Sequence, residues 1–147
     1  MIKQVYLVSI SCALVAGMLS QSQSAQSAQP RIIELTAGRD SRYREGRKVA
    51  PIIEVRPGEP LILRITAVRA ETVARDGSVH GLALLDKNSE AVSGWKFFLH
   101  PGVQDLAVSA PAQPGRYTAV CTVICSDGHE GMGFTLLVTE PAPEKKE

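Results

Sequence analysis

Short runs of apolar and β-branched residues, separated by turns, dominate the chain from residue 31 onward. Several of these runs alternate apolar and polar positions, which is the period of a half-buried strand. Pro57-Gly58 and Pro114-Gly115 supply turn signals between runs. No window of 11 or more residues after residue 30 shows a convincing helical period. The pattern predicts strands at 32–37, 51–55, 61–68, 79–85, 95–99, 106–109, 116–120 and 134–139.

Strands this short, with a turn every 8–12 residues, are typical of an all-β sandwich or barrel with Greek-key connections. The sequence shows no internal repeat. We therefore expect one domain over residues 30–140, followed by a polar, proline-rich tail at 141–147 that does not join the fold.

The first 29 residues have the layout of a secretory signal peptide. Lys3 precedes a mostly apolar stretch from Val5 to Leu19, and a Ser/Gln/Ala segment follows. The apolar core is shorter than the roughly 20 residues that a membrane helix needs. We expect cleavage between residues 22 and 30 and a periplasmic or secreted protein. An uncleaved membrane anchor is the alternative.

Composition excludes some classes of partner. Loss of the signal would remove one charged residue, Lys3, and leave 15 basic residues against 15 acidic ones. This balance does not point to nucleic acid or to an anionic membrane. One local bias, the basic stretch 39–48, is interpreted first as a solvated loop and otherwise as a docking patch for an acidic partner. No set of residues indicates a small-molecule substrate or acid–base catalysis.

The richest chemistry lies between residues 121 and 132. Cys121, Cys125, His129 and Met132 have the spacing C-x3-C-x3-H-x2-M, and Cys12 in the signal segment is the one other cysteine. Thiolate and thioether ligands select copper, and imidazole also serves copper. Structural zinc favours four strong ligands in C-x2-C pairs, and covalent haem requires C-x-x-C-H. A plain disulfide is the main alternative, although it leaves His129 and Met132 unexplained.

A second imidazole has to come from another loop. His80 opens the strand predicted at 79–85, whereas His100 precedes Pro101-Gly102 and has the setting of a turn residue. The residues favour His80 as the further ligand and leave His100 as the alternative.

Residues 51–140 resemble the cupredoxin domain that carries the binuclear CuA centre of cytochrome c oxidase subunit II and nitrous-oxide reductase. The resemblance rests on His80 at the start of a strand, on Pro114-Gly115-Arg116-Tyr117 and on the motif from Cys121 to Met132. It implies two copper ions bridged by Cys121 and Cys125 and capped by His80 and His129. Met132 and the backbone carbonyl of Val123 would be weak ligands.

The resemblance also implies a function and its alternatives. It predicts a one-electron carrier, rather than an enzyme by itself, whose partners are a c-type cytochrome or an oxidase or reductase subunit. Subunit II typically has Glu where this chain has Val123, and it has an N-terminal membrane segment where this chain has an expected signal peptide. An electron-entry subunit of an oxidase, a copper carrier for metal-site assembly and a thiol–disulfide protein stay as alternatives.

Overall fold

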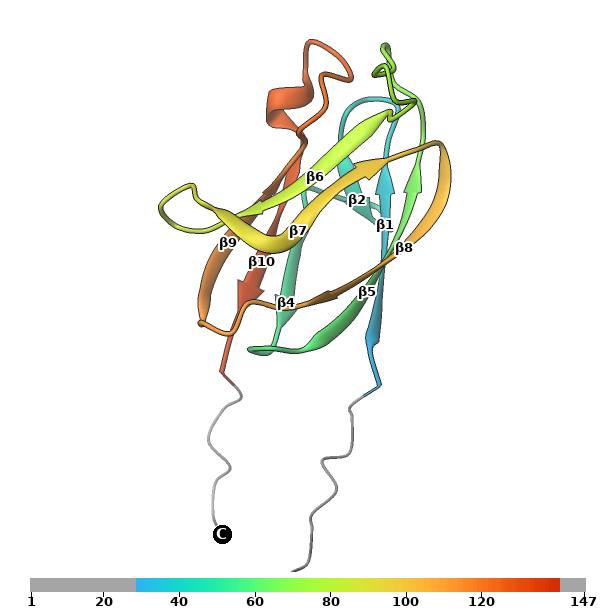
Figure 1. Ribbon diagram of the computed structural model, residues 1–147. Helices are drawn as coiled ribbons and strands as arrows, with labels where there is room; N and C mark the ends of the chain where they lie inside the picture. The colour runs from blue at the N-terminus through green and yellow to red at the C-terminus, as the bar shows by residue number, and fades with distance from the viewer. Residues whose placement is uncertain (1–28, 141–147) are drawn as a thin grey trace, which may run out of the picture.

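The structure is a computed structural model that describes residues 29–140 of the 147-residue chain. The described residues form ten β-strands and one 3-10 helical turn, η1 (Figure 1). In chain order these are β1 Arg31–Ala37, β2 Tyr43–Glu45, β3 Lys48–Val49, β4 Ile52–Val55, β5 Pro60–Ala67, β6 His80–Leu85, β7 Ala91–Leu99, β8 Gly102–Ser109, β9 Gly115–Val120, η1 His129–Gly131 and β10 Gly133–Val138.

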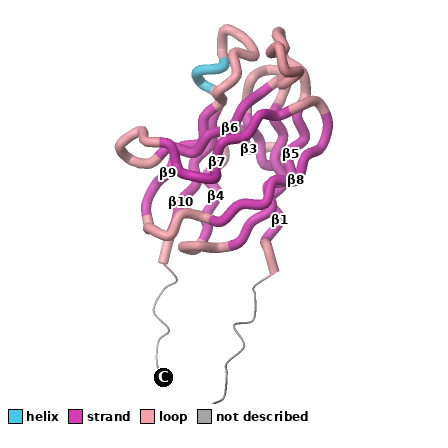
Figure 2. Tube along the Cα trace, in the orientation of Figure 1, coloured by secondary structure: helices cyan, strands magenta, loops and turns pink. Residues whose placement is uncertain are grey.

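The strands make two five-stranded sheets that pack against each other (Figure 2). One sheet has the order β3-β2-β1-β5-β8 and the other has the order β4-β10-β9-β6-β7. Each sheet is mixed, because β1 runs parallel to β5 and β10 runs parallel to β4. The chain passes between the sheets several times, as Greek-key connections require. The predicted single-domain, all-β sandwich is confirmed.

The core follows from alternation along the strands. In β5, Leu61, Leu63 and Ile65 face inward and are at most 1% exposed, whereas the residues between them are partly exposed. β10 alternates in the same way, with Leu136 fully buried. The inward side chains of both sheets meet in one hydrophobic cluster. Since side chains alternate between faces in a strand, this pattern fixes which face of each sheet is inside.

All eight strands that the hydrophobic pattern predicts are present. β7 and β8 begin earlier than expected, at Ala91 and Gly102. β2 and β3 were not predicted, because they are only three and two residues long and lie in the charged segment around 39–49. The interpretation of that segment as a solvated loop is wrong in part, since Tyr43 is fully buried and Ser41 is 2% exposed.

Two expected segments are not covered. The signal peptide, apart from its last residue, and the tail at 141–147 lie outside the described residues, so both stay predictions. Among the described residues, no helix has the length and apolar character needed to span a membrane.

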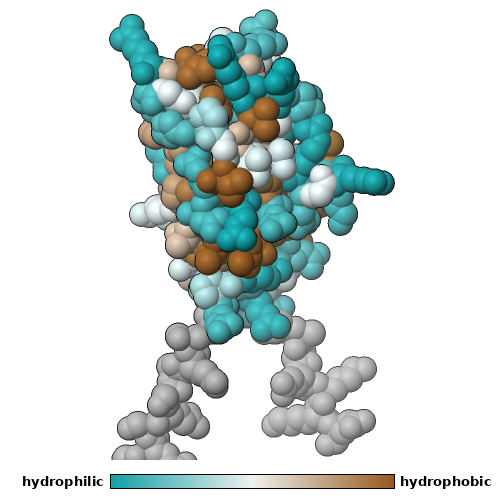
Figure 3. Space-filling model, turned by 90° about the vertical axis from the view of Figure 1, so that its right-hand side faces the viewer, coloured by the Kyte–Doolittle hydropathy of each residue, from teal (hydrophilic) through white to brown (hydrophobic). Residues whose placement is uncertain are grey.

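Surface hydrophobicity is scattered on the face shown in Figure 3. The described residues there are mostly hydrophilic, and hydrophobic residues form separate patches among them. Scattered exposed apolar residues are common on protein surfaces and do not by themselves indicate a docking site.

The sandwich has two distinct ends. The loop from β9 to η1, the loop between β1 and β2 and the loop between β5 and β6 gather at one end, and the described chain enters and leaves at the other (Figure 1). The sequence motif from Cys121 to Met132 therefore lies where three loops meet, far from the ends of the described chain.

Candidate metal centre

The two cysteines of the motif are close together and unlinked. Cys121 follows the last residue of β9, and Cys125 lies four residues further in the same loop. Both are free cysteines, and their Sγ atoms are 3.9 Å apart. A disulfide bond is about 2.05 Å long, so the structure has two thiols here. Cys125 is fully buried, and Cys121 is 9% exposed.

His80 is the imidazole that the fold brings to these thiols. It is the first residue of β6 and is fully buried. Its Nε2 atom lies 2.7 Å from the carbonyl oxygen of Val68. A carbonyl can only accept, so Nε2 carries the proton and donates. The other ring nitrogen, Nδ1, is therefore the one with a free lone pair.

That nitrogen has no hydrogen-bond partner among the described residues. A buried polar atom without a partner costs about 1–3 kcal/mol, and such an atom in a folded protein needs an explanation. Donor atoms of His80, Cys121 and Cys125 all lie within 4.8 Å of one another. His80 thus lies beside the two sulfurs, and a metal ion bound to its Nδ1 and to both sulfurs would satisfy the unpaired nitrogen.

The donor set fits a soft metal. A thiolate–metal bond is about 2.3 Å long, and twice that length exceeds the 3.9 Å between the two sulfurs. Both sulfurs can therefore contact the same ion without moving. The contact between Val68 and Nε2 fixes the tautomer and the ring orientation, as carbonyl partners commonly do for metal-binding histidines.

Burial shifts the pKa values of His80 and Cys121. It lowers the pKa of His80 from its ordinary value, because the charged ring loses solvation. The imidazole is therefore held in the neutral form that binds metals. Burial also raises the pKa of the Cys121 thiol. A metal that binds this sulfur has to displace its proton, as is usual for thiolate sites.

Val123 and Met132 lie in the same buried neighbourhood. The carbonyl oxygen of Val123 is 3.2 Å from the Sγ atom of Cys121, so this backbone oxygen lies next to one of the two thiols. Met132 is 1% exposed, and its carbonyl accepts a hydrogen bond from the backbone N–H of Cys121 at 3.0 Å. The contact closes the loop on itself. Ligation by either residue stays a prediction.

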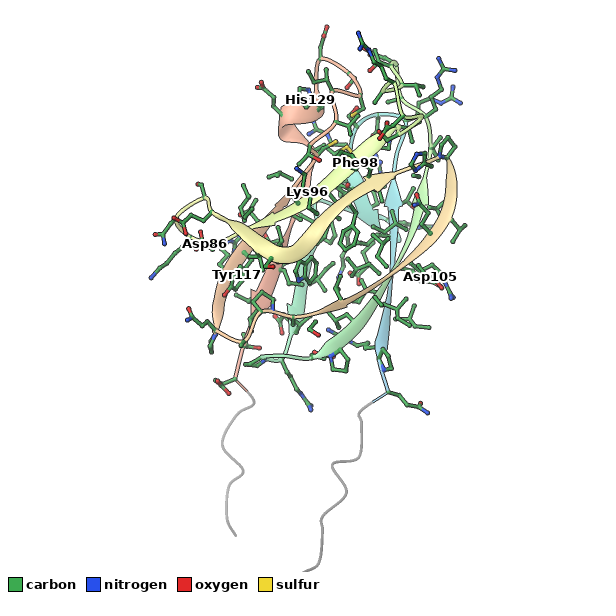
Figure 4. All side chains as sticks on the ribbon, viewed as in Figure 1. Asp86, Lys96, Phe98, Asp105, Tyr117 and His129 are labelled. Carbon is green, nitrogen blue, oxygen red and sulfur yellow. The ribbon has the colours of Figure 1, made fainter. Side chains whose placement is uncertain are left out.

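The structure does not place His129 within the three-residue donor group. His129 begins the turn η1 at the end of the molecule, where Figure 4 labels it. Its Nδ1 lies 3.0 Å from the carbonyl oxygen of Ser126 and donates to it, which leaves Nε2 with the free lone pair. Its role as a ligand stays a prediction.

His100 lies apart from the donor group as well. It is exposed, and its Nε2 lies 3.1 Å from the carbonyl oxygen of Asp76. Of the two candidates for the further imidazole, the structure brings His80 to the thiols.

Comparisons with known proteins agree on the architecture. The chain superimposes on auracyanin A, a "blue" copper protein from Chloroflexus aurantiacus, with a TM-score of 0.51 and 18% identity over 76% of this chain and 100% of that one. The copper protein rusticyanin gives a TM-score of 0.52 and 13% identity over 76% and 80% of the two chains. A chain of a heme-copper terminal oxidase dimer gives 0.50 and 18% over 78% and 68%.

The fold is that of the cupredoxins. At such low identities the likeness concerns the fold alone. A scan against protein-family models and a search of curated proteins both found no match to this sequence.

Within this cupredoxin fold, segment 41–43 also contributes to the site, although no sequence motif predicts it. The hydroxyl of Ser41 lies 3.5 Å from the Sγ atom of Cys125. The guanidinium of Arg42 donates to the carbonyl of Gly131 at 3.0 Å. The phenol of Tyr43 donates to the carbonyl of Gly81, next to His80, at 2.6 Å. No residue spacing signals these contacts, because they join segments that are at least 38 positions apart.

Gly81 permits the close approach of β6 to the cysteine loop. A Cβ atom at this position would lie 2.2 Å from Oγ1 and 3.0 Å from the backbone nitrogen of Thr122. The backbone N–H of Gly81 also donates to the Sγ atom of Cys121 at 3.4 Å. Any side chain here would push the loop away from His80.

We therefore predict that Gly81→Ala loosens the site. Overpacking should lower the free energy of unfolding by about 1–3 kcal/mol and should speed alkylation of the two buried thiols. Chemical denaturation and the rate of iodoacetamide labelling measure these effects. Gly128→Ala is the matched control, because a Cβ there meets only Oγ of Ser126, at 3.8 Å. Equal stability and labelling rates in both variants would contradict the prediction.

Proposed function

We propose that this protein is an electron-transfer protein with a binuclear copper centre of the CuA type. The observation that carries the proposal is the convergence of two buried, free thiols with His80, since donor atoms of the three residues lie within 4.8 Å of one another and Nδ1 of His80 is unpaired. His80, Cys121 and Cys125 would be the main ligands. His129, Met132 and the carbonyl of Val123 would complete the set.

Copper is favoured over zinc by the chemistry of the donors. Two thiolates, imidazoles and a thioether are soft or borderline ligands, and Met132 would be a poor ligand for zinc. Two of the similar structures, auracyanin A and rusticyanin, are described as copper proteins, which supports the same metal for this chain.

Two copper ions are favoured over one by the number of thiols. Both sulfurs lie inside the group of donor atoms, so both can bridge. When bound, a thiolate-bridged copper pair takes up and releases one electron that both ions share. The loop is also held firmly, because Glu71 and Thr72 donate their backbone N–H groups to the carbonyl of Cys125 at 3.1 and 3.0 Å. Ligands that move little between redox states favour fast transfer.

A mobile electron carrier is favoured over the alternatives. A copper carrier has to release its metal, whereas His80 and Cys125 are fully buried. Val123 argues against an electron-entry subunit of an oxidase, because cytochrome c oxidase subunit II typically has the carboxylate of Glu at this position and Val cannot supply one. The partners would be a c-type cytochrome or a subunit of an oxidase or reductase, approaching the end of the sandwich where η1 lies.

The first test of this function is the copper stoichiometry. Copper-loaded protein should hold two copper ions per chain, be purple, and give an EPR signal from one spin shared by two nuclei. Cys125→Ser should lose the shared centre, because one bridge is gone. His100→Ala is the control and should retain it. One copper ion per native chain, or the signal of an isolated copper ion, would show that the binuclear assignment is wrong.

A second test concerns which part of Val123 matters. If its backbone carbonyl is the donor, Val123→Ala should leave the copper spectrum nearly unchanged. The lost burial should still cost about 1–3 kcal/mol of stability, since the side chain is 7% exposed. Ile124→Ala is the control for both the copper spectrum and the stability, because the neighbouring Ile124 side chain is 73% exposed. Loss of the copper spectrum in Val123→Ala alone would contradict backbone ligation.

A third test concerns export and association. We propose that a signal segment within residues 1–29 directs export and is removed, so the protein from the periplasmic fraction should begin between residues 22 and 30, be soluble and contain no haem. Intact-mass and absorption measurements check this. Full-length protein in the membrane would favour an anchored subunit, and co-purification with a haem-containing chain in fixed ratio would favour the oxidase alternative.

A further inference from the structure

Ser41 is a buried polar residue that reaches the cysteine loop from the opposite sheet. It lies between β1 and β2, is 2% exposed, and has a φ of 55°. That φ is in the left-handed region, where a residue other than glycine is uncommon. Such strain persists where the surroundings hold the residue in place, and it often marks a functional position.

The hydroxyl of Ser41 makes two polar contacts. Its Oγ atom lies 3.5 Å from the Sγ atom of Cys125 and 2.5 Å from the Oγ atom of Ser126. The Ser126 hydroxyl also accepts a hydrogen bond from the backbone N–H of Gly128 at 3.2 Å. Each hydroxyl carries one hydrogen, so the directions of these bonds are coupled.

A metal-bound thiolate at Cys125 would fix those directions. A thiolate has no proton and can only accept, so Ser41 has to give its hydrogen to Cys125. Ser126 then gives its own hydrogen to Ser41 and receives the N–H of Gly128. The result is one aligned chain of donors that ends on the sulfur, and aligned chains of this kind strengthen each bond in them.

The two sulfurs are supported differently. The Sγ atom of Cys121 accepts a hydrogen bond from the backbone N–H of Gly81 at 3.4 Å. The Sγ atom of Cys125 instead contacts the side-chain hydroxyl of Ser41, which is not an expected ligand. The support of Cys125 can therefore be removed by a substitution without touching a ligand.

We propose that Ser41 is a positioning residue that raises the reduction potential of the copper centre by donating a hydrogen bond to the Cys125 thiolate. The proposal rests on the proposed function. The reduced centre carries one more negative charge, part of it on the sulfurs, so the bond stabilises the reduced form more than the oxidised form. Hydrogen bonding around a cysteine sulfur is a known control of copper and iron–sulfur potentials.

The test compares Ser41→Ala and Ser41→Gly with the native protein. Both substitutions remove the hydroxyl, but glycine also relieves the backbone strain at φ 55°. Both should lower the equilibrium constant for reduction by a fixed donor roughly three- to tenfold, the effect of about one net hydrogen bond. Two copper ions per chain should remain bound, and the EPR couplings to the Cys125 Cβ protons should change. Ser126→Ala should give a smaller shift of the same sign.

Ser78→Ala is the matched control. Ser78 is also a fully buried serine, but its hydroxyl donates to the carboxylate of Asp76 at 2.6 Å. This variant should keep the native potential.

Each outcome decides the proposal. An unchanged potential in both Ser41 variants, with two copper ions bound, would refute it. A shift in Ser41→Gly but not in Ser41→Ala would assign the effect to the relief of backbone strain at φ 55° and also refute it. Loss of copper from both variants would make Ser41 a residue that holds the loop rather than one that sets the potential. Failure of the native protein to bind two copper ions would instead overturn the proposed function, and with it this proposal.

Discussion

The unpaired Nδ1 atom of His80 is the constraint on which the site depends, because a buried ring nitrogen without a partner is unfavourable in a metal-free protein. Its position is set by the other nitrogen, which donates to Val68. β6 then holds the ring against the loop that carries both cysteines. The fold therefore tolerates an unsatisfied atom where two soft donors lie close by. Stability given up at a site in this way is commonly a sign of function.

The rest of the structure supports this convergence. Segment 41–43 contacts all three parts that carry expected ligands, at Cys125, at Gly131 beside Met132, and at Gly81 beside His80. The loop between β5 and β6 adds a hydrogen bond from the Thr72 hydroxyl to the carbonyl of Ile124 at 2.5 Å. The ligand loop is thus held by segment 41–43 and by the loop between β5 and β6. A site built this way is preorganised, which is what electron transfer with little rearrangement needs.

The sequence predicted the sandwich well because its long strands alternate or are continuously apolar, as β5 and β10 show. It predicted that His80 would lie beside Cys121 and Cys125, because a spacing motif and the small number of histidines restrict the candidates. It did not predict β2 and β3, since short strands in a charged segment have no readable period. It also missed Ser41 and Tyr43, whose contacts depend on how the two sheets pack.

In the proposed function, His80, Cys121 and Cys125 share a copper centre in the native fold. A crystal structure of the copper-loaded protein, with anomalous data at the copper edge, is the decisive test of this arrangement. We expect two copper peaks at the end of the sandwich, each within bonding distance of both sulfurs, with Nδ1 of His80 bound to one of them. A disulfide between the two cysteines, or a copper peak away from His80 Nδ1, would contradict the account.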